Sequence, residues 1–275
     1  MRSIELIQEA ADILERAQIH RPHWTAEQLL AERLGCLPVD LYVQTFPIPA
    51  DESARFLADA AARAGGVPLQ YVLGSAEFYG REFEVGPGVF IPRPETEVLI
   101  EVVMDSFTRA TQVVDVGTGS GVIAVTLAKE RPGLRWVAVE RSTVALHFAR
   151  RNALRHGCAV HLLQGDLLGS LAAGCVDGVV ANLPYLIPEE AGSWPRELAW
   201  EPWLALDGGR GGMELTAKLM GQAATVLRPE GGLMLEIGKG QAWEVSVLAE
   251  QYGFRVERIV PDFAGIERVV ALWKN

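Results

Sequence analysis

Asn182, Leu183, Pro184 and Tyr185 are the residues whose types and order in this chain best suit chemistry. They follow an apolar, strand-like run at 176–180. An Asn side-chain carbonyl beside a main-chain carbonyl offers two acceptors, which could hold an NH2 group by both hydrogens and aim its lone pair at an electrophile. Leu183 precedes proline and is biased towards an extended conformation that exposes its carbonyl, while Tyr185 supplies a ring for a flat group. We therefore predict that these four residues form the catalytic and substrate-binding site.

A glycine-rich turn earlier in the chain is predicted to hold that electrophile. It consists of Gly117, Thr118, Gly119, Ser120 and Gly121, and it follows a strand at 113–116. Ligands of open α/β sheets bind where strands end, and glycines let the backbone approach a ligand closely. The G-x-G-x-G spacing differs from the dinucleotide pattern G-x-G-x-x-G, so a zwitterionic amino acid with a sulfonium fits at least as well as a pyrophosphate. Asp115, at the end of this strand, could accept hydrogen bonds from a ligand ammonium or from loop amides.

Two further acids follow the next two predicted strands. Glu140 ends the run at 136–140, where an acid can accept hydrogen bonds from both ribose hydroxyls. Asp166 follows the strand at 160–163 and could accept from an adenine amino group, while Leu167 could pack on the ring. Asp166 could equally cap a following helix. The glycine turn and the acids at three successive strand ends predict a nucleoside-binding site.

Composition argues against several classes of protein. With a net charge of -10 and a pI near 5.1, the chain lacks the excess of Lys and Arg that a broad nucleic-acid surface needs. Its three scattered cysteines suggest no closed disulfide framework, which favours a reducing cytosol. We find no signal-peptide pattern and no membrane-spanning run, and His20 and His23 have no partner at ligand spacing. We expect a cytoplasmic protein that binds neither membrane nor metal.

The elements that must position these residues begin with a small helical unit. Apolar residues recur at helical spacing from Ile4 to Ala17. A capping-box pattern at Thr25 and Gln28 predicts a second helix that runs to Leu34 and stops at Gly35. A third helix is predicted over 51–64. We assign residues 1–74 to a helical domain that recognises the substrate.

A β-hairpin linker is predicted next, over residues 75–92. Aromatic and Val-rich alternation runs through 78–90 and is broken by glycine and proline at 86–88. The following segment, 91–97, is held extended by two prolines, and Thr96 or Glu95 can then start a helix to Met104.

Residues 93–275 are predicted to form an α/β domain. Strands and helices alternate, which is typical of a parallel sheet with helices on both faces. The predicted strands are 113–116, 136–139, 160–163, 176–180, 233–237, 254–259 and 269–273, and the later helices are 121–130, 143–156, 213–227 and 241–251. The last two strands have only a loop between them, which indicates an antiparallel strand at the sheet edge. By analogy of fold, this favours a seven-stranded, Rossmann-like methyltransferase sheet.

The sequence resembles a known family, the HemK/PrmC type of protein-(glutamine-N5) methyltransferases. Nearly the whole chain takes part in the resemblance, which is most specific in the proline-rich block 91–97. The other matching segments are 70–74, 77–78, 115–121, 182–185, 201–202, 205–206, 208–209 and 235–238. The resemblance implies S-adenosylmethionine as cofactor, with S-adenosylhomocysteine as product. It implies as substrate the Gln of the Gly-Gly-Gln motif of class 1 peptide chain release factors.

The resemblance also implies site residues. It places cofactor contacts at Gly117 to Gly121, Glu140, the Asp166 and Leu167 corner and Asn182, with substrate contacts at 182–185. One departure is Leu183, where the family usually has Pro, a form similar to that of ribosomal RNA adenine-N6 methyltransferases. If the functional atom is the main-chain carbonyl, Leu supplies it equally well. A second departure is the glycine run 208–212, where the family often carries an acid.

The expected mechanism is placement of a substrate amide. The Asn182 oxygen and the Leu183 carbonyl would accept its two hydrogens and stabilise the positive charge that grows on nitrogen during attack. Arg93 and Glu95 could shape the substrate channel, although Arg93 could instead pair with a helix acid. Trp194, Trp200 and Trp203 are expected to pack in the core, with lining of the substrate cleft as the alternative.

Other functions remain open at this point. The same site would serve adenine-N6 methylation of nucleic acid, which the acidic charge disfavours, or methylation of a glutamine in a ribosomal protein. A non-catalytic adaptor that binds a translation factor is disfavoured because Asn182, Tyr185 and the glycine turn are all retained. We expect a monomeric enzyme that acts on a release factor.

Overall fold

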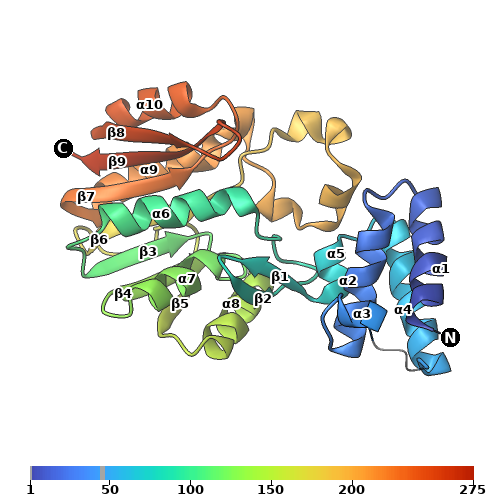
Figure 1. Cartoon of the computed structure of the whole chain (residues 1–275). Helices are drawn as coiled ribbons and strands as arrows, with labels where there is room; N and C mark the ends of the chain where they lie inside the picture. The colour runs from blue at the N-terminus through green and yellow to red at the C-terminus, as the bar shows by residue number, and fades with distance from the viewer. Residues whose placement is uncertain (1, 44–46) are drawn as a thin grey trace. The chain divides into compact units, whose positions relative to one another are not determined.

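The structure is a computed structural model that describes residues 2–43 and 47–275. The chain, coloured by residue number in Figure 1, divides into two compact units. One unit comprises Met1–Ser75 with Pro195–Trp200, and the other comprises Ala76–Trp194 with Glu201–Asn275. Residues 195–200 thus belong to the helical unit, although they lie within the second half of the chain.

The first unit is helical, as the sequence predicts. Its helices are α1 (Ser3–Arg16), α2 (Pro22–Leu34), α3 (Asp40–Val43), α4 (Ala50–Ala64) and α5 (Leu69–Leu73). Their apolar faces meet in one core, in which Leu6, Leu14, Leu30 and Phe56 are fully buried. The short helices α3 and α5 were not predicted, because four or five residues are too few to show a helical period.

The predicted start of α2 is wrong. The helix begins at Pro22, and Thr25 lies inside it with 2% of its surface exposed. Proline suits the first helical position, because an N–H at that position would have no partner within the helix and its absence costs nothing. The predicted end is confirmed, since Gly35 adopts a φ of +62°, a conformation that glycine reaches without strain.

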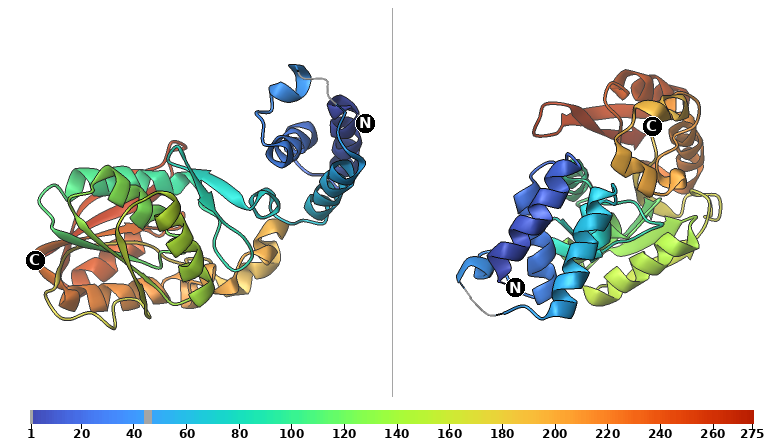
Figure 2. Two further views of the ribbon diagram at one scale, coloured as in Figure 1. Left: turned by 90° about the horizontal axis from the view of Figure 1, so that it is seen from below. Right: turned by 90° about the vertical axis from the view of Figure 1, so that its right-hand side faces the viewer.

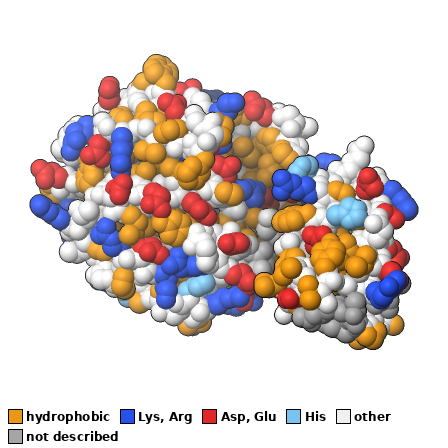
Figure 3. All heavy atoms as spheres, in the orientation of Figure 1, with side chains coloured by type: hydrophobic (Ala, Val, Ile, Leu, Met, Phe, Trp, Pro, Cys, Tyr) orange, Lys and Arg blue, Asp and Glu red, His pale blue; other side chains and the backbone are white. Residues whose placement is uncertain are grey.

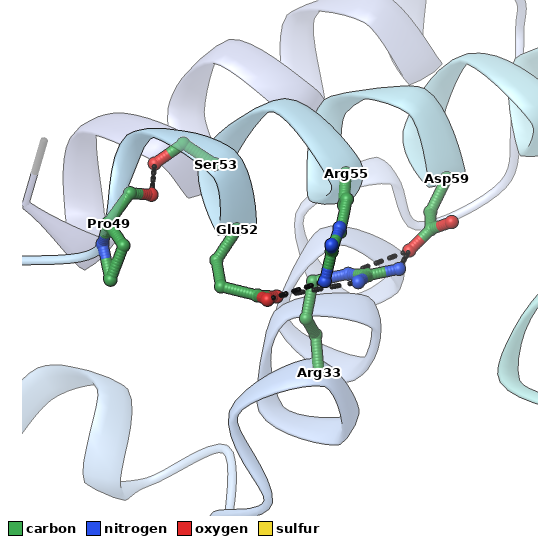
Figure 4. A network of polar contacts seen from close by, with 6 residues as sticks. All are labelled: Arg33, Pro49, Glu52, Ser53, Arg55 and Asp59. Atoms are coloured by element: carbon green, nitrogen blue, oxygen red, sulfur yellow. Dashed lines mark hydrogen bonds and ion pairs between the residues drawn. The ribbon is translucent and has the colours of Figure 1, made fainter.

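A polar network joins α2 to α4 (Figure 4). The Arg33 guanidinium donates to Asp59, with 3.0 Å between Nε and Oδ2, and it also contacts Glu52. Arg55 donates to Glu52 across 2.9 Å. Arg33 therefore bridges two acids on the neighbouring helix. Elsewhere in this unit, the nearly buried Arg63 pairs with Glu197 at 2.5 Å.

The hairpin turn lies earlier in the chain than the glycine and proline residues at 86–88 suggested. Strands β1 (Ser75–Phe78) and β2 (Arg81–Glu84) are joined by Tyr79 and Gly80, whose φ angles are +50° and +65°. Such angles are those of a tight two-residue hairpin turn. The break at 86–88 instead lies beyond β2, and a Cβ on Gly88 would stand 2.8 Å from a Val144 side chain. These glycines allow close packing and do not form the turn.

The second unit contains the predicted seven-stranded sheet. Its strand order is β5-β4-β3-β6-β7-β9-β8, and β9 runs antiparallel to both of its neighbours, β7 and β8. The strands are β3 (Gln112–Val116), β4 (Arg135–Glu140), β5 (Val160–Gln164), β6 (Val176–Asn182), β7 (Leu227–Glu236), β8 (Phe254–Pro261) and β9 (Glu267–Lys274). The predicted antiparallel strand is β9, which lies between β7 and the edge strand β8.

Helices cover both faces of this sheet, as Figures 1 and 2 show. Alternate residues of each strand supply the two cores, which is expected for a sheet buried on both sides. On one face α9 (Glu214–Val226) and α10 (Ala242–Gln251) pack over Val179, Ala181 and Leu235. On the other, the packing against Val113, Val180 and Met234 comes from α6 (Glu97–Ser106), α7 (Val122–Glu130) and α8 (Thr143–Arg155).

A series of short 3-10 turns follows β6. These turns are η2 (Pro188–Ser193), η3 (Arg196–Trp200), η4 (Trp203–Ala205) and η5 (Arg210–Gly212), and another, η1 (Pro94–Thr96), precedes α6. The expectation that the tryptophans here are core residues is wrong. Trp200 and Trp203 are 48% and 52% exposed, and Trp194 stacks on Trp203 with 5.4 Å between ring centroids.

Candidate active site

The carboxyl ends of four neighbouring strands bring the predicted polar residues to one edge of the sheet. Asp115 lies near the end of β3, Glu140 ends β4 and Asn182 ends β6, while Asp166 follows β5. Because β5, β4, β3 and β6 are consecutive and parallel, these positions face the same edge. The order along the sheet thus runs from Asp166 to Asn182.

The glycine turn is held tightly at this edge. The Gly117 N–H donates to the Val139 carbonyl across 2.8 Å, which fastens the turn to β4. Gly117, Gly119 and Gly121 have φ angles of +70°, +58° and +85°, which other residues rarely adopt. A Cβ on Gly117 would stand 3.2 Å from the Leu183 side chain. The turn therefore lies directly against the segment that carries the predicted catalytic residues.

Asp115 supports the turn from inside the protein. Its side chain is fully buried, and its Oδ2 accepts from the Thr118 hydroxyl and, across 3.2 Å, from the Ala124 N–H. Its other oxygen, Oδ1, has no partner among the residues that the structure describes. Burial raises the pKa of Asp115 to about 7, against the effect of these two hydrogen bonds. The two donors are the Thr118 hydroxyl of the turn and an N–H of α7, and not the loop amides that the sequence suggested.

Glu140 links the turn to the next helix. Its Oε2 accepts from the Gly119 N–H across 3.0 Å, and its Oε1 accepts from the Ser142 N–H across 2.8 Å. Ser120 is fixed in turn by Asn152, whose Nδ2 donates to the Ser120 carbonyl across 2.8 Å. Each carboxylate oxygen has a second lone pair, so Glu140 can still accept from two hydroxyls.

Asp166 and Leu167 form a corner after β5. Asp166 is about half exposed and pairs with Lys218, with 2.5 Å between Oδ2 and Nζ. No helix follows it before β6 in the described chain, so the alternative role as a helix cap is wrong. Leu167 is buried with a φ of +52°, a conformation that costs free energy in a non-glycine residue. The corner is thus a constrained one.

Asn182 is oriented by a residue that the sequence did not reveal as functional. Its Nδ2 donates to the Thr96 hydroxyl oxygen across 3.0 Å. Thr96 was predicted to start α6, and it lies at that start, but its side chain makes no capping hydrogen bond there. It is 2% exposed and contacts Asn182 instead. Because the nitrogen is engaged on this side, the Asn182 oxygen is available as an acceptor on the other.

Glu236 is a second residue that the sequence did not single out. It ends β7 directly beside Asn182 in the sheet and is 6% exposed. Burial raises its pKa to about 7, while Arg268 and hydrogen bonds with Thr96 and Asn182 act to lower it. Its signal in the sequence is an acid at the end of an apolar run, and its place beside Asn182 follows only from the order of the strands in the sheet.

The segment after Asn182 is packed closely by glycines. Leu183 is 6% exposed and belongs to the sheet core, whereas Pro184 and Tyr185 are partly buried. A Cβ on Gly212 would stand 2.3 Å from the Tyr185 carbonyl oxygen, and one on Gly208 would stand 2.7 Å from the Tyr185 Cα. Burial, and then the charge of Glu236, raise the pKa of Tyr185 to about 12, so its hydroxyl stays neutral.

Arg93 pairs with an acid, as one alternative predicted, but that acid does not lie on a helix. It pairs with Glu201, a buried residue between two 3-10 turns, and its guanidinium lies 4.6 Å from the centroid of the Phe90 ring. Glu201 also accepts from the Ile91 N–H across 3.0 Å. Arg93 therefore helps to fix the proline-rich segment. Glu95 lies close enough for its charge to raise the pKa of Glu236 and Tyr185.

No group of three or more side chains suited to a metal ion occurs in residues 2–43 and 47–275. In the same ranges, no helix is long and apolar enough to cross a membrane.

Two family models match the sequence. Residues 5–74 match the PrmC N-terminal domain, and residues 83–193 match the methyltransferase small domain. Among solved structures, a methyltransferase from Pyrococcus furiosus superposes with a TM-score of 0.55. It is 19% identical, and the match covers 82% of this chain and all of that one. At this identity the likeness shows the fold alone.

Curated proteins are similar over almost their whole length. A release factor glutamine methyltransferase from Koribacter versatilis is 42% identical, over 94% of this chain and 93% of that protein. A protein of the same name from Nitratidesulfovibrio vulgaris is 37% identical, over 98% of this chain and 94% of its own.

Proposed function

This chain belongs to the release factor glutamine methyltransferase family, and we propose that it methylates a class 1 peptide chain release factor. The acceptor is the side-chain amide nitrogen, N5, of the Gln in the Gly-Gly-Gln motif. The observation that carries the proposal is the orientation of Asn182, whose nitrogen donates to Thr96 and whose oxygen is therefore free to accept. Such an acceptor, on the edge that carries the glycine turn, suits an NH2 group of the substrate.

The turn and its neighbours fit S-adenosylmethionine as cofactor. The unpaired, buried Oδ1 of Asp115 can accept from a ligand ammonium, and Glu140 can accept from the ribose hydroxyls. Asp166 and Leu167 would bind the adenine. When bound, the cofactor would supply a sulfonium methyl group for transfer to the amide nitrogen, with S-adenosylhomocysteine as the other product.

Asn182 and Leu183 act on the amide that attacks. An amide nitrogen is a poor nucleophile because its lone pair is delocalised into the carbonyl. The Asn182 Oδ1 and the Leu183 carbonyl accept its two hydrogens and stabilise the positive charge that develops on nitrogen. Most of the rate enhancement comes from placement. The alkylated nitrogen is acidic and loses one proton to water, so this step needs no strong base.

Leu183 can replace the proline that is usual in the family. Its contribution is a main-chain carbonyl, which any residue provides, and the following Pro184 still restricts its backbone. Its side chain packs in the core beside Gly117. Tyr185 supports the substrate group, and Arg93 with Glu95 shapes the approach to it.

The helical unit recognises the protein substrate. We assign this role to residues 1–74, joined through a hairpin linker at 75–92 to the catalytic domain at 93–275. Acidic and basic side chains are mixed over the face drawn in Figure 3. Together with the net charge of -10, this favours a protein over a nucleic acid as substrate. The enzyme acts as a monomer in the cytoplasm, without a metal.

Mass spectrometry of a release factor tests the function. The factor is co-expressed with this enzyme in cells that lack their own methyltransferase of this family. We expect one added methyl group on the Gly-Gly-Gln peptide, and none without the enzyme or when that Gln is replaced by Glu. Methyl transfer to a ribosomal protein or to RNA, with the release factor unmodified, would identify one of the alternative substrates instead.

A further inference from the structure

Glu236 is a buried acid to which the proposed chemistry gives no role. It is the register neighbour of Asn182 across β6 and β7. Residues two positions earlier in each strand, Val180 and Met234, pack on the face that α6 covers. Because side chains alternate along a strand, Asn182 and Glu236 point to this same face, where Thr96 lies at the start of α6.

The directions of the hydrogen bonds follow from the types of group. Thr96 and Asn182 lie near enough to Glu236 to lower its pKa, and because an ionised carboxylate only accepts hydrogen bonds, any hydrogen bond between them has Thr96 or Asn182 as donor. The Thr96 hydroxyl oxygen accepts from the Asn182 Nδ2 across 3.0 Å, which leaves the Thr96 hydrogen free to point at Glu236. The carboxamide nitrogen is thereby engaged by Thr96, on the side of the sheet where Glu236 lies. A rotation of the Asn182 amide by half a turn would place its oxygen against a carboxylate, which is unfavourable.

We propose that Glu236 is a positioning residue that, with Thr96, locks the Asn182 carboxamide with its oxygen directed at the substrate. This inference rests on the proposed function of Asn182 as the acceptor of the substrate amide. A negative charge on the nitrogen side also polarises the carboxamide, since hydrogen bonds in series strengthen one another in a low-dielectric interior. The oxygen that faces the substrate becomes the stronger acceptor.

The structure gives a reason for an acid at this position. Burying a carboxylate is costly, and Glu236 Oε2 has no partner in the described chain. An apolar residue would fill the space without that cost but could not fix the amide. Charged groups near Glu236 are Arg268 on β9 and Glu95 on η1, and Tyr185 is close but neutral.

The proposal predicts a dependence on pH. Protonation of Glu236 gives it an O–H donor, so the direction of the hydrogen bonds is no longer fixed. Since its pKa lies at about 7, the fraction of locked Asn182 falls as pH is lowered through this value. Asp115 titrates in the same range, but it supports the cofactor turn, so its protonation acts on cofactor affinity.

Steady-state kinetics of Glu236→Gln test the role in turnover. Gln has nearly the same shape but one acceptor oxygen and one donor group. We expect kcat to fall by about tenfold or more, the worth of one hydrogen bond to a charged group, with little change in cofactor affinity. The fall in wild-type kcat below about pH 7 should disappear in this variant. Thr96→Ser should retain most of the activity, and Thr96→Val should not.

A matched control carries the same substitution elsewhere in the sheet. Glu257 is exposed on β8 and lies outside the candidate site. Its carboxylate accepts a hydrogen bond from the Trp273 indole N–H. Glu257→Gln should leave kcat and its pH profile unchanged. The proposal would be overturned if Glu236→Gln kept the wild-type kcat and the same fall in kcat at low pH.

Nuclear magnetic resonance of the free enzyme gives a readout that needs no substrate. The side-chain NH2 signals of Asn182 should shift with pH in the wild type, with a midpoint at about 7, and should not do so in Glu236→Gln. Signals that do not respond to pH in the wild type would contradict the proposal. If these signals titrate as expected but no release factor is methylated, the proposed function fails and the positioning of Asn182 by Glu236 stands.

Discussion

Asn182 has two separate tasks in the proposed mechanism, one on each side of its carboxamide. Its nitrogen donates to Thr96 within the protein, and its oxygen accepts from the substrate amide. Asn182→Ala removes both groups. We expect turnover to fall by about a hundredfold or more, as for the loss of one preorganised polar contact, while cofactor affinity largely persists. Single-turnover kinetics with separate cofactor titration check this, and unchanged turnover would contradict the role of Asn182.

Sequence patterns identified only some residues of the candidate site. Asp115, Glu140 and Asn182 could be predicted because parallel strands bring their ends to one edge. Thr96 and Glu236 could not, because their importance depends on which face of the sheet they share. Thr96 also resembled an ordinary helix start, and Glu236 looked like the end of an apolar strand.

At the scale of elements, the glycine run 208–212 packs on the segment that carries the catalytic residues. Gly212 has a φ of +70°, and a Cβ there would meet the Tyr185 carbonyl oxygen at 2.3 Å. Gly212→Ala should displace Tyr185 and the preceding carbonyl and lower turnover by up to about a hundredfold, since a shift of about 1 Å can cost this much. Turnover assays with Gly133→Ala as control check this, because no atom lies within 4 Å of a Cβ there. Equal activity of both variants would contradict it.

Asp177 joins β6 to the start of β3. Although burial acts to raise its pKa, hydrogen bonds from the Thr111 and Gln112 amides and from Arg228 lower it to about 2. A lowered pKa stabilises the fold above the ordinary value of 3.8, and this stability is lost as pH falls through about 2. Asp177→Asn should reduce the free energy of unfolding at neutral pH by about 2 kcal/mol.

Denaturant unfolding at several pH values checks this effect. The difference between wild type and Asp177→Asn should be constant at neutral pH and shrink below about pH 4. Asp105→Asn is the control, because Asp105 is 72% exposed and lies 3.8 Å from Arg258. Exposed pairs of this kind contribute little. If the difference in free energy of unfolding instead grew as the pH fell, it would contradict the contacts assigned to Asp177.

Elements differed in how well the sequence revealed them. Strands and helices from β3 to β9 were predicted because each is a continuous apolar or periodic run. The 3-10 turns between β6 and α9 were not, since three to six residues show no period. The tryptophans of this region were misplaced for the same reason: without an element, no face could be assigned to them.

At the scale of the whole molecule, the helical unit and the seven-stranded sheet were both predicted, including the antiparallel strand. Helical spacing in one part and strand–helix alternation in the other have different periods, which is why the sequence separates them. That residues 195–200 belong to the helical unit could not be predicted, because this depends on contacts between segments far apart in the chain, such as that of Arg63 with Glu197.

In the proposed mechanism, Asn182 and Leu183 together bind the substrate amide beside the cofactor. A crystal structure of the enzyme with S-adenosylhomocysteine and a peptide that contains Gly-Gly-Gln tests it most directly. We predict that the Asn182 Oδ1 and the Leu183 carbonyl oxygen each lie at about 3 Å from the glutamine amide nitrogen. A glutamine bound elsewhere, or an Asn182 side chain turned away from it, would contradict this role of Asn182 and Leu183.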